Sequence, residues 1–326
     1  MTSTRRPRSK HHDWPLSGSP AQSPSPASCD VRNTWAQLDS LSVAGSRIYT
    51  TRLMDLRYRI LSSRIGRVVL LPFRAKCALG YCLPPVGRAL TWVATSREHT
   101  NFTYDLTSLN RLHLAETISI VTGKQAGEVG SAFLELQEDH DLAERVRAGT
   151  MDGPMRWVSD RVARYGRRLG WYAMVRLLKP RIVVETGVDK GLGAVVICAA
   201  LLRNSTEGSP GRYFGIDINP AAGHLLCAPY TATGQMVYGD SLQVLSGFTP
   251  HIDLFVNDSD HSAAFEYQEY KTIRAKLAEG AAILGDNCHE SESLLRFSHE
   301  CGRRFLFWRE QPKDHWYPGG GIGFSY

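Results

Sequence analysis

Apolar positions follow two different rhythms along this chain. Between about residues 104 and 178 they recur every three or four positions, which predicts amphipathic helices. These helical segments cover 109–123, 131–149 and 157–180. From Arg181 onward, short runs rich in β-forming residues alternate with helical stretches. The runs cover 181–187, 212–218, 235–240, 252–258 and 281–287, and the clearest helical stretches cover 194–202 and 265–280.

This alternation predicts an α/β fold in which helices cover both faces of a mostly parallel sheet. Two further runs, 305–310 and 321–326, are joined by a short link containing Pro and Gly, too short for a helical crossover. We therefore expect them to form an antiparallel pair at the sheet edge. The predicted organisation is a mainly helical accessory region over 31–168 and a catalytic domain over 169–326.

The front of the chain differs in composition. Residues 1–30 are rich in Ser, Pro, Arg and His, which predicts a disordered tail. Residues 34–98 mix apolar and basic positions, and Pro84 and Pro85 predict a break near their end. Either amphipathic helices there cover the catalytic domain, or the region attaches peripherally to an anionic membrane surface or an acidic partner.

Charge and cysteine content narrow the class of protein. Residues 1–100 hold 15 Lys and Arg against 5 Asp and Glu, whereas the remainder holds 23 against 27. The acidic catalytic part, which lacks an N-P-P-Y-type motif, argues against nucleic acid as substrate. Seven cysteines without a C-x-x-C pair, no secretory signal and no long apolar run lead us to expect a cytoplasmic protein.

Glycines and carboxylates cluster where the first three runs end. The first run leads into V-E-T-G-V-D-K-G-L-G, from Val184 to Gly193, whose glycines permit a tight turn close to a ligand. The spacing differs from the G-x-G-x-x-G of dinucleotide binders, and Glu185 would repel a phosphate but suit a cationic ligand. Asp217 ends the second run, where it can bind ribose hydroxyls, a feature that fits NAD equally well. Asp240 ends the third run, where it can meet an adenine amino group.

In this order and spacing, these residues resemble the class I S-adenosylmethionine-dependent methyltransferases, from about Gly170 to the end. The resemblance is closest to the branch with E-T-G-V and D-S-x-H-S motifs, which contains metal-dependent sugar and small-molecule O-methyltransferases. It implies a Rossmann-like sheet whose last strand is antiparallel, and S-adenosyl-L-methionine as cofactor. The resemblance implies that Glu185, Gly187 and Gly191 hold the methionine part, Asp217 the ribose, and Asp240 and Ser241 the adenine. Thr186, Gly193 and Ile218 are further expected cofactor-binding residues.

The fourth and fifth runs end in polar residues suited to catalysis. Asp258, Asp286 and Asn287 offer three oxygen ligands from neighbouring strand ends, a donor set that suits Mg²⁺ or Mn²⁺. Metal-dependent O-methyltransferases resemble this arrangement, although Asp260 here could compete with Asp258. His261 is the predicted general base, because an alcohol attacks a methyl group poorly until it is deprotonated.

Several alternatives stay open. The acidic residues could be helix caps without a metal, His261 could be a structural hydrogen-bonding group, and His289 could line the pocket. The leading function is O-methylation of a small-molecule or glycan acceptor. The others are a hydroxylase-like relative on the same fold, and a non-catalytic cofactor-binding module recruited to a membrane or partner. The sequence leaves the oligomeric state open, with a homodimer among the alternatives.

Overall fold

The computed structural model describes residues 58–99, 103–154 and 156–326, so the predicted disordered tail 1–30 lies outside the described residues. The chain divides into two compact units, Met1–Val86 and Gly87–Tyr326. The predicted boundary between residues 168 and 169 stays a prediction. Within the described ranges, no helix is both long and apolar enough to cross a membrane.

The described part of the first unit is helical. Helix α3 (Arg64–Val69) begins after Ser63, whose hydroxyl accepts a hydrogen bond from the Gly66 amide. Helix α4 (Leu71–Thr95) then runs through Pro84 and Pro85, so the predicted break at these prolines is wrong. Both prolines remove backbone donors, but this part of α4 is largely exposed, where water can satisfy the carbonyls left without partners.

Helix α4 ends inside the second unit, and the described residues between it and the sheet form α5 (Ser108–Thr122), α6 (Ala126–Gln137), α7 (His140–Asp152) and α8 (Arg168–Leu178). The segment 131–149, predicted as helical, is divided between α6 and α7, because Asp139 accepts a hydrogen bond from the Leu142 amide and starts a new helix. Helix α8 begins later than predicted. Gly166 adopts a φ of +50°, and only a short 3₁₀ turn at Arg156–Val158 precedes it.

Seven strands form one sheet in the order β3-β2-β1-β4-β5-β7-β6. They are β1 (Ile182–Thr186), β2 (Arg212–Asp217), β3 (Gly234–Tyr238), β4 (Ile252–Asn257), β5 (Leu277–Asp286), β6 (Phe305–Arg309) and β7 (Gly321–Ser325). Strands β1 to β5 pair in parallel, and β7 is antiparallel to both of its neighbours. The predicted α/β class and antiparallel final pair are confirmed.

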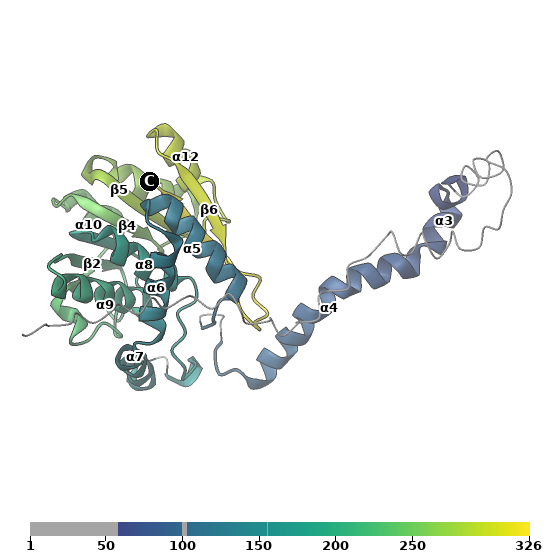
Figure 1. The fold of residues 1–326 in the computed structure, drawn as a ribbon, viewed down its shortest axis with the longest axis horizontal. Coiled ribbons are helices and arrows are strands. Elements are labelled where there is room, and N and C mark those ends of the chain that lie inside the picture. Colours follow the sequence, from purple (N-terminus) through teal and green to yellow (C-terminus); the bar gives the residue numbers. More distant parts are fainter. Residues whose placement is uncertain (1–57, 100–102, 155) are drawn as a thin grey trace, which may run out of the picture. The chain divides into compact units, whose positions relative to one another are not determined.

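Helices cover both faces of this sheet (Figure 1). Helix α9 (Leu192–Thr206) packs with α8, α6 and α5 on one face, and α10 (Ser241–Gly247), α11 (Ala263–Ile273) and α12 (Ser293–Glu300) cover the other. Helix α11 ends earlier than the predicted stretch 265–280, because a 3₁₀ turn at Arg274–Lys276 leads into β5.

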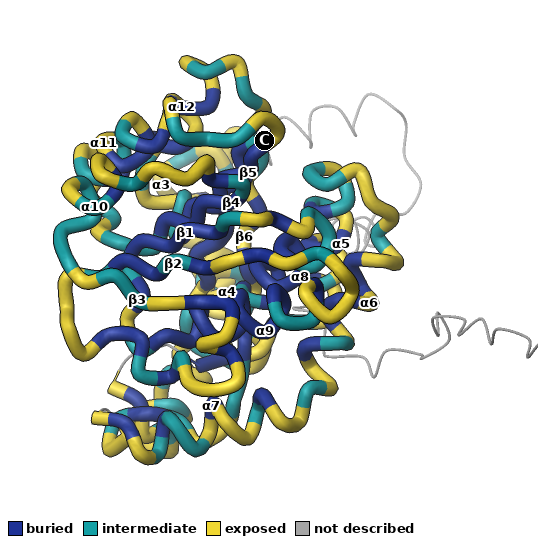
Figure 2. Tube along the Cα trace, turned by 90° about the vertical axis from the view of Figure 1, so that its left-hand side faces the viewer, coloured by how far each residue is buried: buried dark blue, intermediate teal, exposed yellow. Residues whose placement is uncertain are grey.

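The alternation of side chains along each strand divides the core in two. Val183 and Leu254 belong to the cluster beneath α8 and α9, whereas Val184 and Phe255 belong to the cluster beneath α11 and α12. Figure 2 shows the resulting buried centre, in which the dark segments follow β1, β4 and β5. A sheet buried on both faces leaves its loop ends as the natural place for ligands.

Candidate active site

A cavity of about 510 Å³ lies at the carboxyl ends of β1, β2, β3 and β4. Five of the predicted cofactor residues line it: Gly187, Asp217, Ile218, Asp240 and Ser241. Its wall also includes Asp258, Asp260 and Phe265, which come from the loop after β4 and from α11. The strand ends therefore bring together residues from four segments, as the rule for open α/β sheets predicts.

Gly187 lets two of these loops meet. Its φ is +78°, a conformation that side chains disfavour, and a Cβ atom there would overlap the carbonyl oxygen of Asp258. The Asp258 amide donates a 2.9 Å hydrogen bond to the Thr186 carbonyl, which continues the β1–β4 pairing into the loops. The loop after β1 therefore lies directly against the loop that carries the predicted catalytic residues.

The carboxylates of Asp217 and Asp240 hold backbone as well as lining the cavity. Asp217 accepts hydrogen bonds from the amides of Val188 and Asp189, at 2.8 and 3.0 Å, and so shapes the loop after β1. Asp240 accepts one from the Gln243 amide at 2.9 Å and caps α10. The capping interpretation and the binding interpretation are thus compatible for these residues.

Glu185 lies beneath the loop, outside the residues that line the cavity. Its Oε2 accepts a 2.5 Å hydrogen bond from the Tyr213 hydroxyl, and a Cβ at Gly193 would approach its Oε1 to 2.5 Å. Burial raises the pKa of Glu185 to about 8. Gly193 therefore makes room for this carboxyl group, and Gly191, at a φ of +97°, precedes the first residue of α9. Thr186, also predicted at the cofactor, is buried with its hydroxyl 3.4 Å from Glu269.

The predicted reaction residues converge beside the cofactor cavity. One candidate ligand atom each from Asp258, His261 and Asp286 lies within 4.8 Å of the others, a metal-compatible group found within the described ranges. Asn287 joins them, because its Nδ2 lies 3.2 Å from His261 Nε2. Its Oδ1 is buried and has no hydrogen-bond partner among the described residues. Asn287 adopts a φ of +50°, a left-handed conformation that asparagine tolerates better than most residues.

Two arginines that the sequence analysis did not single out neutralise this acidic group. Arg167 forms a bidentate ion pair with Asp286, through Nε to Oδ1 and Nη2 to Oδ2. Arg168 Nη2 lies 3.9 Å from Asp258 Oδ2. Burial and the charge of Asp286 raise the pKa of Asp258 well above its usual range. Burial also opposes ionisation of Asp286, but the Arg167 guanidinium outweighs it and lowers that pKa.

His261 is held between carboxylates on both sides of its ring. Its Nδ1 lies 3.6 Å from Glu266 Oε1, and its Nε2 lies 3.8 Å from Asp258 Oδ1. The Glu266 carboxylate raises the pKa of His261. Glu266 itself is buried on α11 and accepts a 2.5 Å hydrogen bond from the Ser291 hydroxyl. The histidine therefore has one nitrogen facing an orienting acid and the other facing the reaction site.

A buried network continues from Arg167 away from the cavity. Its Nη1 lies 2.7 Å from the Tyr104 hydroxyl and 3.1 Å from Glu310 Oε1, and that hydroxyl donates a 2.8 Å hydrogen bond to Glu310 Oε2. Glu310 directly follows β6, and an acidic residue at the end of a strand is a sequence pattern that could have identified it as a candidate site residue. Arg167, in the sequence R-R-L-G, resembles an ordinary basic residue at a helix start and offered no such signal.

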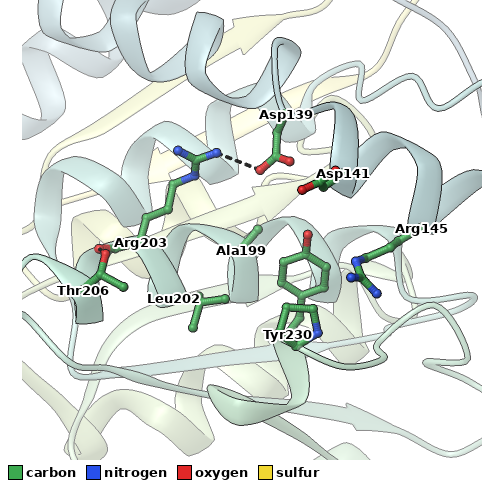
Figure 3. A pocket seen from close by; sticks show the side chains of 9 residues that line it. Asp139, Asp141, Arg145, Ala199, Leu202, Arg203, Thr206 and Tyr230 are labelled. Atoms are coloured by element: carbon green, nitrogen blue, oxygen red, sulfur yellow. Dashed lines mark hydrogen bonds and ion pairs between the residues drawn. The ribbon is translucent and has the colours of Figure 1, made fainter.

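A second cavity, of about 310 Å³, lies between α7, α9 and the 3₁₀ turn Tyr230–Ala232 (Figure 3). Several of its charged side chains have partners: Arg203 Nη2 lies 2.8 Å from Asp139 Oδ2, and Arg145 donates a hydrogen bond to the Ala228 carbonyl at 3.1 Å. None of the predicted site residues lines it. It lies on a helical face, away from the strand ends that form the first cavity.

Comparisons with known proteins give one family model and a group of solved structures. Residues 184–288 match a family model described as methyltransferase domain. A comparison with curated proteins gives no match. Similar solved structures include an O-methyltransferase from Bacillus cereus in complex with SAH, at 16% identity and a TM-score of 0.42, over 58% of this chain and 91% of that one. A methyltransferase from Geobacter sulfurreducens has 21% identity and a TM-score of 0.40, over 56% and 88%. The O-methyltransferase TomG from Streptomyces achromogenes, in complex with SAM, has 16% identity and a TM-score of 0.41, over 58% and 89%.

The family match spans the segment from β1 to the residues just after β5 and contains all the predicted cofactor, metal and base residues. The sheet around it has the antiparallel final strand that the resemblance implied. On this evidence residues 184–288 form a methyltransferase domain.

Proposed function

We propose that this methyltransferase acts on a hydroxyl oxygen of a sugar, glycolipid or other small-molecule acceptor, with His261 as general base and a divalent ion at Asp258, Asp286 and Asn287. One observation carries the proposal. Asp258 lines the cofactor cavity and also belongs to the compact group with His261 and Asp286. Groups able to activate a hydroxyl therefore adjoin the site proposed to present the methyl group.

The donor set fits Mg²⁺ or Mn²⁺. Asn287 Oδ1 is buried and finds no partner in the part of the chain that the structure describes, and Asp258 carries a carboxyl group that its surroundings do not stabilise as an anion. Asp286 is already paired with Arg167, but each carboxylate oxygen has two lone pairs, so this pairing leaves acceptor capacity for a cation. When bound, such an ion lowers the pKa of a coordinated hydroxyl and orients it.

The protein side chains account for the remaining steps. The acceptor oxygen attacks the sulfonium methyl carbon in line, and the carbon–sulfur bond breaks to release S-adenosylhomocysteine. His261 takes the hydroxyl proton at Nε2, the nitrogen that faces Asp258. Glu266, beside Nδ1, holds the ring in place and stabilises the imidazolium that forms.

Acceptor-side contacts are proposed around Gly320, in the link between β6 and β7. A Cβ atom there would meet Asn287 Oδ1, the Tyr317 hydroxyl and His289 Cε1, the last two at 2.9 and 3.1 Å. Glycine lets the backbone of this link lie close against three side chains that carry groups able to hydrogen-bond, beside the proposed metal ligands. Such a cluster suits an acceptor with several hydroxyl groups, as in a sugar.

The metal and base are tested by chelation and substitution. EDTA should abolish the conversion of S-adenosylmethionine to S-adenosylhomocysteine over a panel of sugar and phenolic acceptors, and Mg²⁺ or Mn²⁺ should restore it. Binding of S-adenosylhomocysteine should survive chelation, since its proposed contacts come from other residues. The paramagnetic resonance spectrum of added Mn²⁺ should report binding directly, and Asp286→Asn should weaken that binding.

His261→Ala should lower turnover by roughly 10²–10⁴-fold, the usual range for losing a positioned general base. His251→Ala, an exposed histidine just before β4, is the matched control and should retain full activity. Full activity in EDTA after exhaustive dialysis would exclude the metal. Normal turnover by His261→Ala would exclude this histidine as the base.

A further inference from the structure

Residues 58–86, here called the basic apolar segment, carry an unusual combination of side chains. They include five basic residues, Arg59, Arg64, Arg67, Arg74 and Lys76, and no Asp or Glu. This segment contains α3 and most of α4, and it belongs to the first compact unit. None of its residues is among those described above for the methyltransferase site.

The same segment exposes many large apolar side chains. Their exposed fractions run from 46% at Ile60 to 72% at Tyr58. The others are Ile65, Val68, Val69, Leu71, Phe73, Leu79, Tyr81, Leu83 and Val86. No residue of α4 is buried, and Gly66 is the one buried residue of α3. So many exposed large apolar side chains within one short segment favour an interaction site.

The helical spacing sorts these residues into faces. Leu71, Leu79, Leu83 and Val86 fall on one side of α4, since residues three, four, seven or eight apart share a face. Arg74 and Lys76 fall on either side of this stripe. Long basic side chains at the borders of an apolar stripe can lie along an apolar phase while their charges reach polar groups above it.

We propose that the basic apolar segment binds the surface of a membrane that contains anionic lipids, with α3 and α4 lying in the interface. Lipid headgroups supply the negative charge that five cations without carboxylates require, and the acyl region supplies the apolar phase. No described helix meets the length and hydropathy needed to span a bilayer, so binding would be peripheral.

Charge argues against two other binding partners for this segment: a second copy of it, and residues 1–57 of the same chain. A second copy of the segment would bring two sets of five cations together. Residues 1–57 hold eight Lys and Arg against four Asp and Glu, so they too carry a positive surplus. A second copy of the segment and residues 1–57 are both positively charged and would repel it, whereas anionic lipid attracts it.

Flotation of the full-length chain with vesicles tests the proposal. Vesicles of phosphatidylcholine with 30% phosphatidylglycerol, taken as about the anionic fraction that gives a cytoplasmic-type surface potential, should carry the protein upward. Vesicles of phosphatidylcholine alone should not. Binding should weaken steeply as salt rises from 50 to 300 mM, roughly halving the Debye length.

Two sets of substitutions separate charge from apolar contact. Changing Arg64, Arg67, Arg74 and Lys76 to Gln should weaken binding by at least about 100-fold at low salt. Changing Leu71, Leu79 and Leu83 to Ser should weaken binding without altering the charge. The matched control changes Lys124, Arg161, Arg212 and Arg274, four exposed basic residues of the second unit, to Gln and should bind as the wild type does. Far-ultraviolet circular dichroism checks that each variant remains folded.

Equal binding to both kinds of vesicle, or no binding to either, would overturn the proposal. A second result would also overturn it: light scattering shows an oligomer that the three Ser substitutions dissociate, and vesicles bind no protein. The apolar stripe would then join copies of the chain. Loss of binding in the control variant would also overturn it. None of these results bears on methyl transfer, which is assayed separately.

Discussion

The surroundings of Glu185 favour its neutral form. It is fully buried at the end of β1, facing the Tyr213 hydroxyl, with Arg168, Asp217 and Asp286 as the nearby charges. Burial dominates and raises its pKa to about 8, whereas an unfolded chain would titrate near 4.5. Between these values the folded state holds a proton that the unfolded state has lost, so this residue makes stability fall as pH rises.

We expect Glu185→Gln to flatten that dependence. The cofactor-free wild type should lose stability between pH 5 and 8, with Glu185 contributing at most about 1.4 kcal/mol per pH unit. Urea denaturation at several pH values measures the slope in wild type and variant, and the difference isolates Glu185 from other buried acids. Glu116→Gln, at an exposed position on α5, is the control. Identical slopes in the wild type and Glu185→Gln would contradict the buried neutral acid.

At this scale, residue types were easier to predict than their roles. The sequence predicted carboxylates and glycines at the right strand ends, because those positions follow from the alternation of strands and helices. It assigned Glu185 and Gly193 to the cofactor; the structure places them against each other beneath the loop, and their role at the cofactor stays a prediction. The ion pair of Arg167 with Asp286 joins residues 119 positions apart, a separation at which no local pattern operates.

Arg167 also joins secondary-structure elements. It lies at the start of α8, pairs with Asp286 at the end of β5, and contacts Glu310 after β6 and Tyr104 before α5. Arg167→Met would leave two buried carboxylates without their cation. Removing one partner from a buried ion pair typically costs about 3–5 kcal/mol, so we expect a loss of stability in that range by urea denaturation.

Arg147→Met provides the comparison, since this arginine pairs with Glu144 on the exposed surface of α7. Its removal should change stability little, because exposed ion pairs are screened by solvent. Arg167→Met with wild-type stability would mean that the buried carboxylates are protonated or solvated without it.

At two helix boundaries the pattern of apolar residues and prolines in the sequence was not enough to predict the structure. Helix α4 continues through Pro84 and Pro85, because exposed carbonyls can bond to water. The segment 157–167 has helical spacing but holds irregular backbone and a left-handed Gly166, which turns the chain so that Arg167 reaches the sheet. In both cases tertiary or solvent contacts outweighed local preference.

For the whole molecule, ligand binding should shift the folding equilibrium. S-adenosylmethionine and S-adenosylhomocysteine should raise the melting temperature, since a ligand at 100 times its Kd adds about 2.7 kcal/mol to the folded state. NAD should not. Asp217→Ala should reduce the shift, because Asp217 lines the cofactor cavity and holds the loop after β1.

Asp141→Ala, in the second cavity, should leave the shift unchanged and so controls for general effects of removing an acid. Stabilisation by NAD without stabilisation by S-adenosylmethionine would contradict the cofactor assignment. The sheet itself was predictable at this scale, because strand runs and link lengths restrict its topology to few arrangements.

The position of β7 between β5 and β6 sets an order of assembly. Strand β6 pairs only with β7 in this sheet, so it cannot join before β7 is in place. The two are neighbours in sequence, and closing the short link between them costs little entropy compared with closing the longer connections. They should therefore meet first as a hairpin and dock on β5 as a unit. Docking brings Glu310 to Arg167, so this step also gives the arginine its second carboxylate partner.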